Sequence, residues 1–546
     1  VGVLLLGEQP GSLLPAAQEP VRGGIYAEGL VGNLQRLNPV LDYYNSVDRD
    51  VDRLIYSSLF RFDARGVPQA DLVESWGISK DGKIYNFTLR PNIRWHDDEP
   101  LTADDVAFTL DLIRSEGSIW PTDLRDFWNN VEYKQFSEDT FQFILPEPFA
   151  PFLDYLTFGI VPRHLLGDLS FDQIIDAPYN LQPVGSGPYK FDRLIVEDGQ
   201  ITGVVLSFFE DYYGDKPFLE QLVFRYYPDS AAALQAYNEG LVQGISSVST
   251  DVLSQALAQP DLSVYTGRMP ELSMILFNLK DPEVSFLQDE VVRKSLLMGL
   301  NRQWMIDRVL QGQAILASGP ILPGTWAYYD GLQSVEYDPE AAKAALKEAE
   351  YVVPAEGEPI RTKDNLALSF HLIYPNDELH QALADRIKQD WALLDVNVEL
   401  EALPYDQLVY ERLDGRNYQA ALVDLNLARS PDPDPYPFWD QAQATGGQNY
   451  TQWDDRIASE YLEQARVTTD LSERARLYRN FQVIFAEQLP ALPLYYPVYS
   501  YAVDSQVQGV QMGPLFDSSD RFATITDWFL MAKLPQEAGL TPTAGQ

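Results

Sequence analysis

The sequence contains no cysteine among its 546 residues. This absence excludes disulfide bonds, thiolate zinc sites and thiol nucleophiles. Basic residues are also few, because 40 Lys and Arg stand against 80 Asp and Glu, which gives a formal net charge of −40. A surface of that sign repels the phosphates of nucleic acids and of anionic lipids. We therefore expect no nucleic acid partner and a well-hydrated protein surface.

Long apolar runs are missing as well. No stretch reaches the roughly 18 apolar residues that are needed to span a bilayer. The opening run V-G-V-L-L-L-G, followed by Pro10 and Pro15, is typical of the end of a hydrophobic export segment that leads into a linker. We expect residues 1–21 to be this remnant and linker, with a disordered end as the alternative, and residues 534–546 to form a flexible tail.

Motifs for catalysis and for phosphate or metal binding are absent too. The G-S-G triplet at 185–187 is not a nucleophile elbow, because Val184 stands where a glycine is required and Pro188 follows, so a structural turn is the better interpretation. No phosphate loop and no G-x-G-x-x-G run occurs. The histidines are His96, His164, His371 and His380, and none lies in an H-E-x-x-H run. We expect no catalytic residue, no metal site and no cofactor, and a binding cleft fits this chain better than an active site.

The chain is rich in material for folded cores, with 45% hydrophobic and 12% aromatic residues. Its length predicts about three or four packing units. Alternating apolar residues predict strands at 83–90 and around 141–145, and a capping box at Thr102 with Asp105 predicts a helix after it. Asp338 followed by Pro339 predicts another helix start, and a 3.6-residue apolar stripe predicts a helix through 477–485. Such interleaving indicates an α/β fold of mixed sheets flanked by helices.

Several short runs recur together, in the same order, in one known family. The most specific is L-R-P-N-I-R-W-H-D-D-E-P-L-T-A-D-D-V at 89–106. Others are A-D-L-V-E-S-W at 70–76, P-V-G-S-G-P-Y-K-F at 183–191, Y-D-P-E-A-A-K at 337–343 and L-P-A-L-P-L-Y at 489–495. Over about residues 22 to 530 the chain resembles the extracytoplasmic solute-binding proteins of family 5, the dipeptide and oligopeptide receptors of ABC importers.

The resemblance implies a bilobed periplasmic-binding-protein fold of type II, with the extra domain of the peptide-receptor cluster. Lobe I would comprise residues 22–267 and 498–533, with an inserted subdomain at about 44–183, and lobe II residues 268–497. Crossover segments near Arg268–Leu272 and Pro493–Tyr499 would let the lobes hinge over a ligand.

The ligand contacts of the family match this sequence only in part. In its peptide receptors, an aspartate shortly before an Asp-Pro turn pairs with the amino terminus of the peptide. Here the matching position is Arg429 or Pro431, depending on which Asp-Pro is matched, and neither is an acid. A buried ammonium needs a carboxylate, which Asp424 supplies only if the loop takes a different path. For the ligand carboxylate the sequence offers His371 at best, which weakens the case for a zwitterionic dipeptide.

We place the ligand between residues 43–46 of the first lobe and 424–429 of the second. Trp326, Trp439, Tyr436 and either Tyr43 or Tyr44 are candidate walls for sugar rings, with a core aromatic as the alternative for each. The candidate ligand-binding residues are Tyr43, Tyr44, Asn45, Trp326, His371, Asp424, Asn426, Leu427, Arg429 and Trp439.

The predicted function is that of a substrate-binding receptor, which captures a peptide-like solute and delivers it to the permease subunits of an ABC importer. The alternatives are an oligosaccharide or other non-peptide solute on the same scaffold, a cell-surface hydrolase, and a degenerate receptor acting as a chaperone or sensor. We expect a monomer, exported to the periplasm or the outer face of the cytoplasmic membrane.

Overall fold

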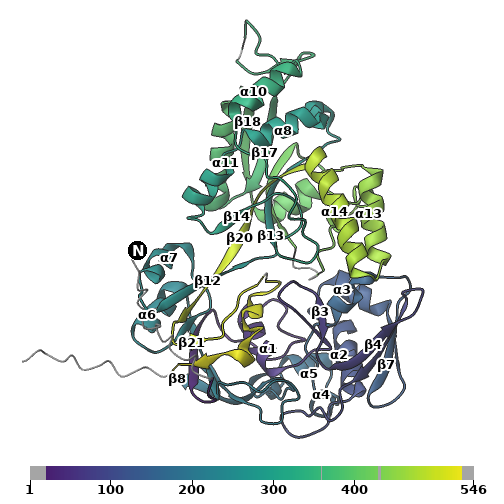
Figure 1. Ribbon diagram of the computed structural model, residues 1–546, viewed down its shortest axis with the longest axis vertical. Coiled ribbons are helices and arrows are strands. Elements are labelled where there is room, and N and C mark those ends of the chain that lie inside the picture. The colour runs from purple at the N-terminus through teal and green to yellow at the C-terminus, as the bar shows by residue number, and fades with distance from the viewer. Residues whose placement is uncertain (1–19, 358, 428–431, 514, 532–546) are drawn as a thin grey trace, which may run out of the picture.

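The computed structural model describes residues 20–357, 359–427, 432–513 and 515–531. The predicted tail at 534–546, most of the predicted export remnant, and Arg429 lie outside these residues. One long strand, β20 (Ala491–Asp504), connects the two halves of the main sheet and runs from the upper to the lower part of the molecule in Figure 1. Its aromatic and β-branched residues are mostly buried, as expected of a central strand.

The lower half of the main sheet is built on the C-terminal part of β20. Its strand order is β8-β9-β10-β1-β11-β20, with β12 also paired to β20. The β1 strand runs parallel to β10 and β11, and the other pairs are antiparallel. The strands are β1 (Ile25–Val31), β8 (Tyr189–Glu197), β9 (Gln200–Phe208), β10 (Gln221–Tyr227), β11 (Gly244–Ile245) and β12 (Leu262–Arg268). Helices α6 (Ser230–Asn238) and α7 (Thr250–Leu257) pack beside it.

The upper half uses the N-terminal part of β20, in the order β18-β17-β19-β13-β20 with β14 also on β20. Its strands are β13 (Glu271–Phe277), β14 (Ala314–Leu316), β17 (Ser369–Pro375), β18 (Asn397–Leu403) and β19 (Ala420–Asn426). The helices on this half include α8 (Glu290–Met298), α10 (Pro339–Glu348), α11 (Glu378–Ala392), α13 (Arg456–Val467) and α14 (Leu471–Gln488). Helix α10 begins at Pro339 and α14 spans the predicted stripe, so both helix predictions are confirmed.

A separate antiparallel sheet lies beside the lower half, with the order β4-β5-β7-β6. Its strands are β4 (Val73–Ile78), β5 (Ile84–Leu89), β6 (Glu132–Gln135) and β7 (Thr140–Ile144). The predicted strands at 83–90 and 141–145 are β5 and β7. Next to them lies α2 (Ala103–Arg114), and Thr102 and Asp105 form the predicted capping box. Local patterns therefore predicted this part of the fold correctly.

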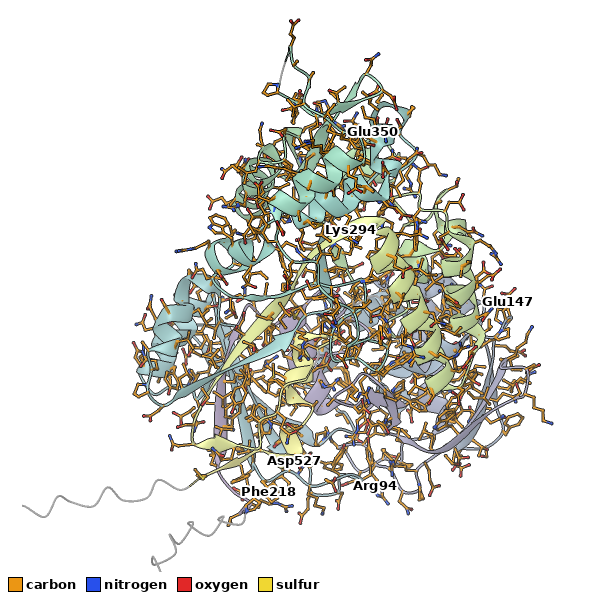
Figure 2. All side chains as sticks on the ribbon, turned by 45° about the horizontal axis from the view of Figure 1, so that its top comes forward. Arg94, Glu147, Phe218, Lys294, Glu350 and Asp527 are labelled. Atoms are coloured by element: carbon orange, nitrogen blue, oxygen red, sulfur yellow. The ribbon has the colours of Figure 1, made fainter. Side chains whose placement is uncertain are left out.

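The hydrophobic residues form two large cores. The first takes residues from 26 to 224 and again from 501 to 528, and the second takes residues from 272 to 496. The chain passes between the cores near residues 268–271 and 497–500. Charged side chains, among them Arg94, Glu147 and Glu350, cover the outside (Figure 2), which is where the excess negative charge is hydrated.

Candidate functional site: a cleft between two cores

Two adjoining cavities lie where the first core faces the second. The first has a volume of about 480 Å³ and the second about 440 Å³. Leu124, Tyr155, Asn426 and Phe516 line both cavities, so they form one continuous cleft. Asn426 ends β19 on the second-core side, whereas Tyr155 lies in η1 (Ala150–Leu156) and packs on the first core. Each cavity has the size of a typical small-molecule site.

Helix α1 (Ser46–Ile55) forms one wall of the first cavity. Asn45 caps it, because its side-chain oxygen accepts a hydrogen bond from the backbone N–H of Val47 at 3.1 Å. Along the helix, Arg49, Asp52 and Arg53 line the cavity. The helix thus presents both signs of charge to the cleft.

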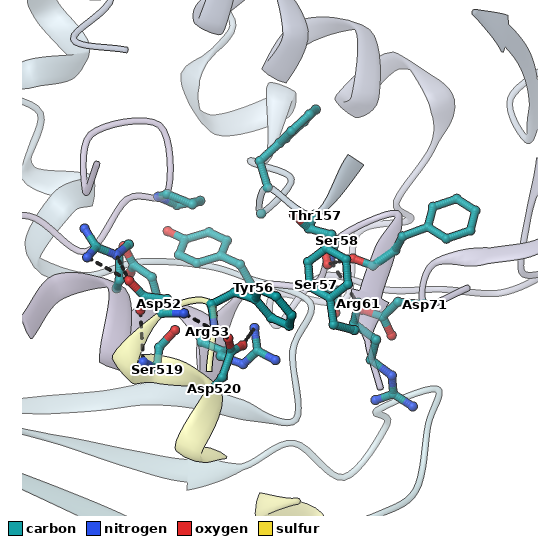
Figure 3. A pocket seen from close by; sticks show the side chains of 18 of the residues that line it. Asp52, Arg53, Tyr56, Ser57, Ser58, Arg61, Asp71, Thr157, Ser519 and Asp520 are labelled. Atoms are coloured by element: carbon teal, nitrogen blue, oxygen red, sulfur yellow. Dashed lines mark hydrogen bonds and ion pairs between the residues drawn. The ribbon is translucent and has the colours of Figure 1, made fainter. Parts of the chain in front are cut away.

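The arginines of α1 are matched by aspartates from a distant segment. Arg49 pairs with Asp517 at 2.8 Å. Arg53 pairs with Asp520 at 3.1 Å (Figure 3). Asp517 also forms a capping box at the start of η7 (Ser518–Phe522), which fixes that carboxylate in place. Both ion pairs are partly buried, so they connect α1 to η7 and stabilise the wall of the cavity.

A third arginine, Arg61, lines this cavity together with Asp71, away from α1 (Figure 3). Burial raises the pKa of Asp71, and the positive charge of Arg61 partly offsets that rise. The Asp71 carboxylate accepts hydrogen bonds from the Tyr213 hydroxyl at 2.8 Å and from the Ser58 backbone at 3.3 Å. Its polar partners are therefore within the protein.

Two further carboxyls, Asp42 and Asp52, lie together in the wall and face no arginine of their own. Burial raises the pKa of each well above its ordinary value; Arg49 opposes the rise at Asp42, and each of the two carboxyls affects the other. Asp52 is 2% exposed, and the groups that act on its carboxyl by hydrogen bonding are the Asp42 carboxyl and the Asn38 backbone. Burial and the neighbouring carboxyl both favour the protonated form of such a group.

Aromatic rings form the opposite wall of the first cavity. Tyr43, Trp120, Trp128 and Phe158 all line it. The Trp120 ring lies 5.8 Å from Tyr43 and 6.0 Å from Phe158, measured between centroids. Such faces can stack on flat groups or attract a cation.

The second cavity is lined mainly by the segment that follows β19. Its wall includes residues 432–435 and Pro437 together with Trp439 and Leu427. The charges here are paired, since Arg466 binds Asp434 at 2.7 Å and Arg474 binds Asp432 at 2.8 Å.

Asp154, in η1, lies in the wall of the first cavity near this second pair. It is 3% exposed, and one of its carboxylate oxygens has no hydrogen-bond donor among the described residues. Burial and the nearby Asp432 raise its pKa well above the ordinary value, and Arg474 only partly opposes them. Arg474 already donates to Asp432, to the Ala465 carbonyl and to the Tyr478 hydroxyl.

The structure brings four of the sequence-predicted residues to the cleft. Tyr43 lines the first cavity, Leu427 and Trp439 line the second, and Asn426 lines both. Trp439 is also a core residue, packed edge-on against Phe485. Of the two ranges predicted to hold the ligand, 43–46 and 424–429, the residues that line the cleft are therefore Tyr43, Asn426 and Leu427.

Other predicted residues lie elsewhere. Tyr44 is 75% exposed beside Tyr43, and Asn45 serves as the helix cap. Trp326 packs on Tyr478 in the second core, and Tyr436 lies under Arg466. His371 is exposed on β17, 3.6 Å from Glu399.

Asp424 also lies outside the lining of both cavities. Its carboxylate binds Nε2 of His380 at 3.0 Å, while Nδ1 of His380 binds Asp377 at 2.7 Å. Burial alone would lower the pKa of His380, but the two carboxylates outweigh it and raise that pKa. Asp424 therefore already has a partner within the protein.

The G-S-G turn is structural, as predicted. His96 accepts a hydrogen bond from the backbone N–H of Gly185 at 3.2 Å, and its other ring nitrogen lies 3.0 Å from the Gly187 carbonyl. Burial lowers the pKa of His96 to about 4. His96 is therefore neutral, and its two ring nitrogens stabilise the turn.

Sequence reasoning missed Asp42, Asp52, Arg53 and Asp154, because a run such as D-R-D-V-D-R is typical of a solvated helix face. In the described part of the chain, no group of three or more His, Asp or Glu side chains is placed to hold a metal ion. Within the same residues, no helix combines the length and apolar character that a membrane crossing requires.

Two packed cores, two chain crossings between them and a lined cleft at their junction define the class of two-lobed solute-binding receptors. Residues 67–448 match the family described as bacterial extracellular solute-binding proteins, family 5 (middle). The chain belongs to this family, which confirms the resemblance seen in the sequence. Its members are binding receptors and not enzymes, and this chain is a solute-binding protein of an ABC importer.

Similar proteins agree over nearly the whole length. The dipeptide-binding protein of Escherichia coli K12 is 26% identical over 543 residues, which cover 94% of this chain and 96% of that protein. The structure of HbpA2 from Haemophilus parasuis has a TM-score of 0.81 at 22% identity, and covers 93% of this chain and 100% of its own. That of NikZ from Campylobacter jejuni in complex with Ni(L-His) has a TM-score of 0.65 at 23% identity, with 92% and 99% covered. The predicted fold class is confirmed.

Proposed function

We propose that this receptor captures a peptide-like small solute in the cleft and delivers it to the membrane permease of its importer. The observation that carries the proposal is the continuous cleft, whose two cavities share Asn426 and Tyr155 from opposite cores. The similarity to a dipeptide-binding protein along almost the full chain supports a peptide as the solute.

The cleft closes, in this proposal, by a hinge between the lobes predicted at 22–267 with 498–533 and at 268–497. Two features support it. The chain crosses between the cores at Met269-Pro270 and at Pro497-Val498, and the Met269 N–H donates to the Pro497 carbonyl at 3.2 Å. Proline has no N–H to give to a sheet, so Pro497 interrupts the ladder of β20 where its partner changes from β14 to β12. Such short crossings absorb a rotation with little loss of packing.

A ligand panel tests the proposal. Thermal denaturation is measured in the presence of each ligand, and the panel contains dipeptides, tripeptides, tetrapeptides, oligosaccharides and Ni(L-His). Native mass spectrometry then identifies the bound species by their mass. A peptide present at a hundred times its Kd stabilises the fold by about 2.7 kcal/mol. We expect concentration-dependent stabilisation by peptides, weakened in Asn426→Ala and unchanged in Asn86→Ala, an exposed asparagine outside the cleft.

A second candidate is a non-peptide solute, favoured by the wall of Tyr43, Trp120 and Phe158, which suits flat or ring-shaped groups. Stabilisation by oligosaccharides or by Ni(L-His) alone, with every peptide inert, would overturn the peptide proposal in favour of this one.

A further inference from the structure

The charges that line the first cavity do not balance. Arg49 and Arg53 form ion pairs with Asp517 and Asp520, whereas Arg61 acts on Asp71 only through space. Three more carboxyls then remain in the lining, and these are Asp42, Asp52 and Asp154. All three are more than nine-tenths buried, at 8%, 2% and 3% exposure. Unpaired carboxyls are rarely buried, because the loss of hydration is unfavourable for the charged form.

The arginines near these carboxyls are already occupied. The Arg49 guanidinium donates to Asp517 and to the backbone carbonyls of Asp42 and Tyr43, so it reaches the Asp42 side chain only through space. Arg474 is the cation that lowers the pKa of Asp154, but it forms its ion pair with Asp432. Among the described residues, one oxygen of Asp154 therefore has no hydrogen-bond donor, and no arginine or lysine side chain donates to Asp52.

We propose that the first cavity receives a cationic, N–H-bearing side chain of the solute, an amine or a guanidinium, which Asp154 and the Asp42–Asp52 pair bind. This inference rests on the proposed receptor function and names the chemical class of the solute. The aromatic faces of Tyr43 and Trp120 in the same cavity favour a cation as well. Carboxylate oxygens that lack donors need N–H groups, so a quaternary ammonium satisfies the site less well than a primary amine.

Binding of such a cation is linked to protons. Burial raises the pKa of all three carboxyls, which favours their protonated forms while the cleft contains only water. A cation binds their ionised forms, so it releases protons, and its affinity increases as the pH rises. Other ionisable groups that act on Asp42 and Asp52 are Asp48, Arg49, Tyr56, Tyr179, Tyr226 and Asp517. Those that act with Asp154 are Asp432, Arg474 and Tyr85, and the tyrosines remain neutral because burial raises their pKa.

The test is calorimetric titration with Ala-Lys-Ala, Ala-Arg-Ala, the neutral isostere Ala-norleucine-Ala, the trimethyl-lysine form, and the peptide-free cations cadaverine and agmatine. We expect the lysine and arginine peptides to bind roughly tenfold to hundredfold more tightly than the norleucine peptide. Their binding heats should differ between phosphate and Tris buffers by the heat of proton release, and their Kd should fall as the pH rises. The trimethyl-lysine peptide should lose most of the gain in affinity that the lysine peptide shows over the norleucine peptide.

Two variants separate binding from folding. Asp154→Asn and Asp52→Asn should each remove the preference for the cationic peptides and leave the affinity for the norleucine peptide unchanged. Their melting temperatures should stay equal or increase, because a buried unpaired carboxyl destabilises the empty protein. Asp126→Asn, an exposed carboxylate on α3 (Thr122–Asn129), is the matched control and should change neither.

The outcomes distinguish this inference from the function on which it rests. If neutral and cationic peptides bind alike and without proton release, the inference is wrong and the peptide receptor stands. If cadaverine or agmatine binds and every peptide fails, the cation site stands and the peptide proposal falls. If no cationic probe binds, or if the Asn variants weaken all ligands equally, the inference is overturned.

Discussion

Glu271, the first residue of β13, offers a direct test of the electrostatics near the chain crossing. It follows Met269-Pro270 and acts on Asp424, which also binds His380. Burial, and then the Asp424 carboxylate, raises the pKa of Glu271 from 4.5 to about 7, although His380 opposes the rise. The perturbation is Glu271→Gln, which keeps the shape of the side chain and removes its titration.

The sign follows from proton binding. The folded protein holds this proton more tightly than the unfolded chain does, so the unfolding free energy falls as the pH rises from about 4.5 to about 7. The difference between these two pKa values corresponds to roughly 3 kcal/mol above pH 7. We expect Glu271→Gln to be more stable than the parent at pH 8, by up to that amount, and equally stable at low pH.

The assay is urea denaturation followed by tryptophan fluorescence across this pH range. Glu210→Gln, an exposed glutamate on the same protein, serves as the control and should leave the pH dependence unchanged. A Glu271→Gln protein that is less stable than the parent at pH 8, or a difference that does not vary with pH, would refute the reasoning. The charged and ionisable groups that surround this site are Asp377, His380, Tyr405, Asp424 and Tyr495.

Two further predictions concern the first core. Arg521 is fully buried and binds Glu28 at 2.7 Å and Asp50 at 2.6 Å, so Arg521→Met should destabilise the fold by about 3–5 kcal/mol, measured by urea denaturation. An unchanged denaturation midpoint would contradict this. Gly185→Ala places a methyl group against the Ile55 carbonyl and should cost about 1–3 kcal/mol, seen as a lower melting temperature, whereas an equal or higher one would show that the turn adapts.

The sequence predicted best those elements whose signal is local. Strand β5 shows in the alternation of Tyr85 and Phe87, and helix α2 shows in the capping box at Thr102. These patterns depend on neighbours within a few residues, so tertiary packing did not change them.

The cleft depended on contacts that no local pattern contains. Arg49 and Arg53 line a cavity because Asp517 and Asp520, more than 460 positions along the chain, pack against α1. Asp424 was a candidate ligand contact, but it lies within β19, and His380 on α11 binds its carboxylate. Whether a charged side chain is buried depends on the assembled fold. Sequence composition alone therefore predicted that the aspartates of the cleft are exposed to solvent.

The same limit applies to the end of α14. Leu489 adopts φ of 46°, a left-handed conformation that usually calls for glycine or asparagine. The buried Arg293 guanidinium explains this, because it donates to the carbonyls of Gln488 and Leu489 and so fixes the helix end. A helix end of this kind cannot be recognised without the distant arginine.

The central claim is that two lobes close over a solute held between them, and a distance measurement tests it most directly. Since the chain has no native cysteine, Asp126→Cys on α3 and Ile457→Cys on α13 can carry the only two spin labels, one on each side of the cleft. Pulsed electron–electron double resonance should show a shorter and narrower distance distribution between the two labels when a bound peptide saturates the protein. A distribution that stays the same at saturation, with binding confirmed by calorimetry in the same sample, would contradict the account.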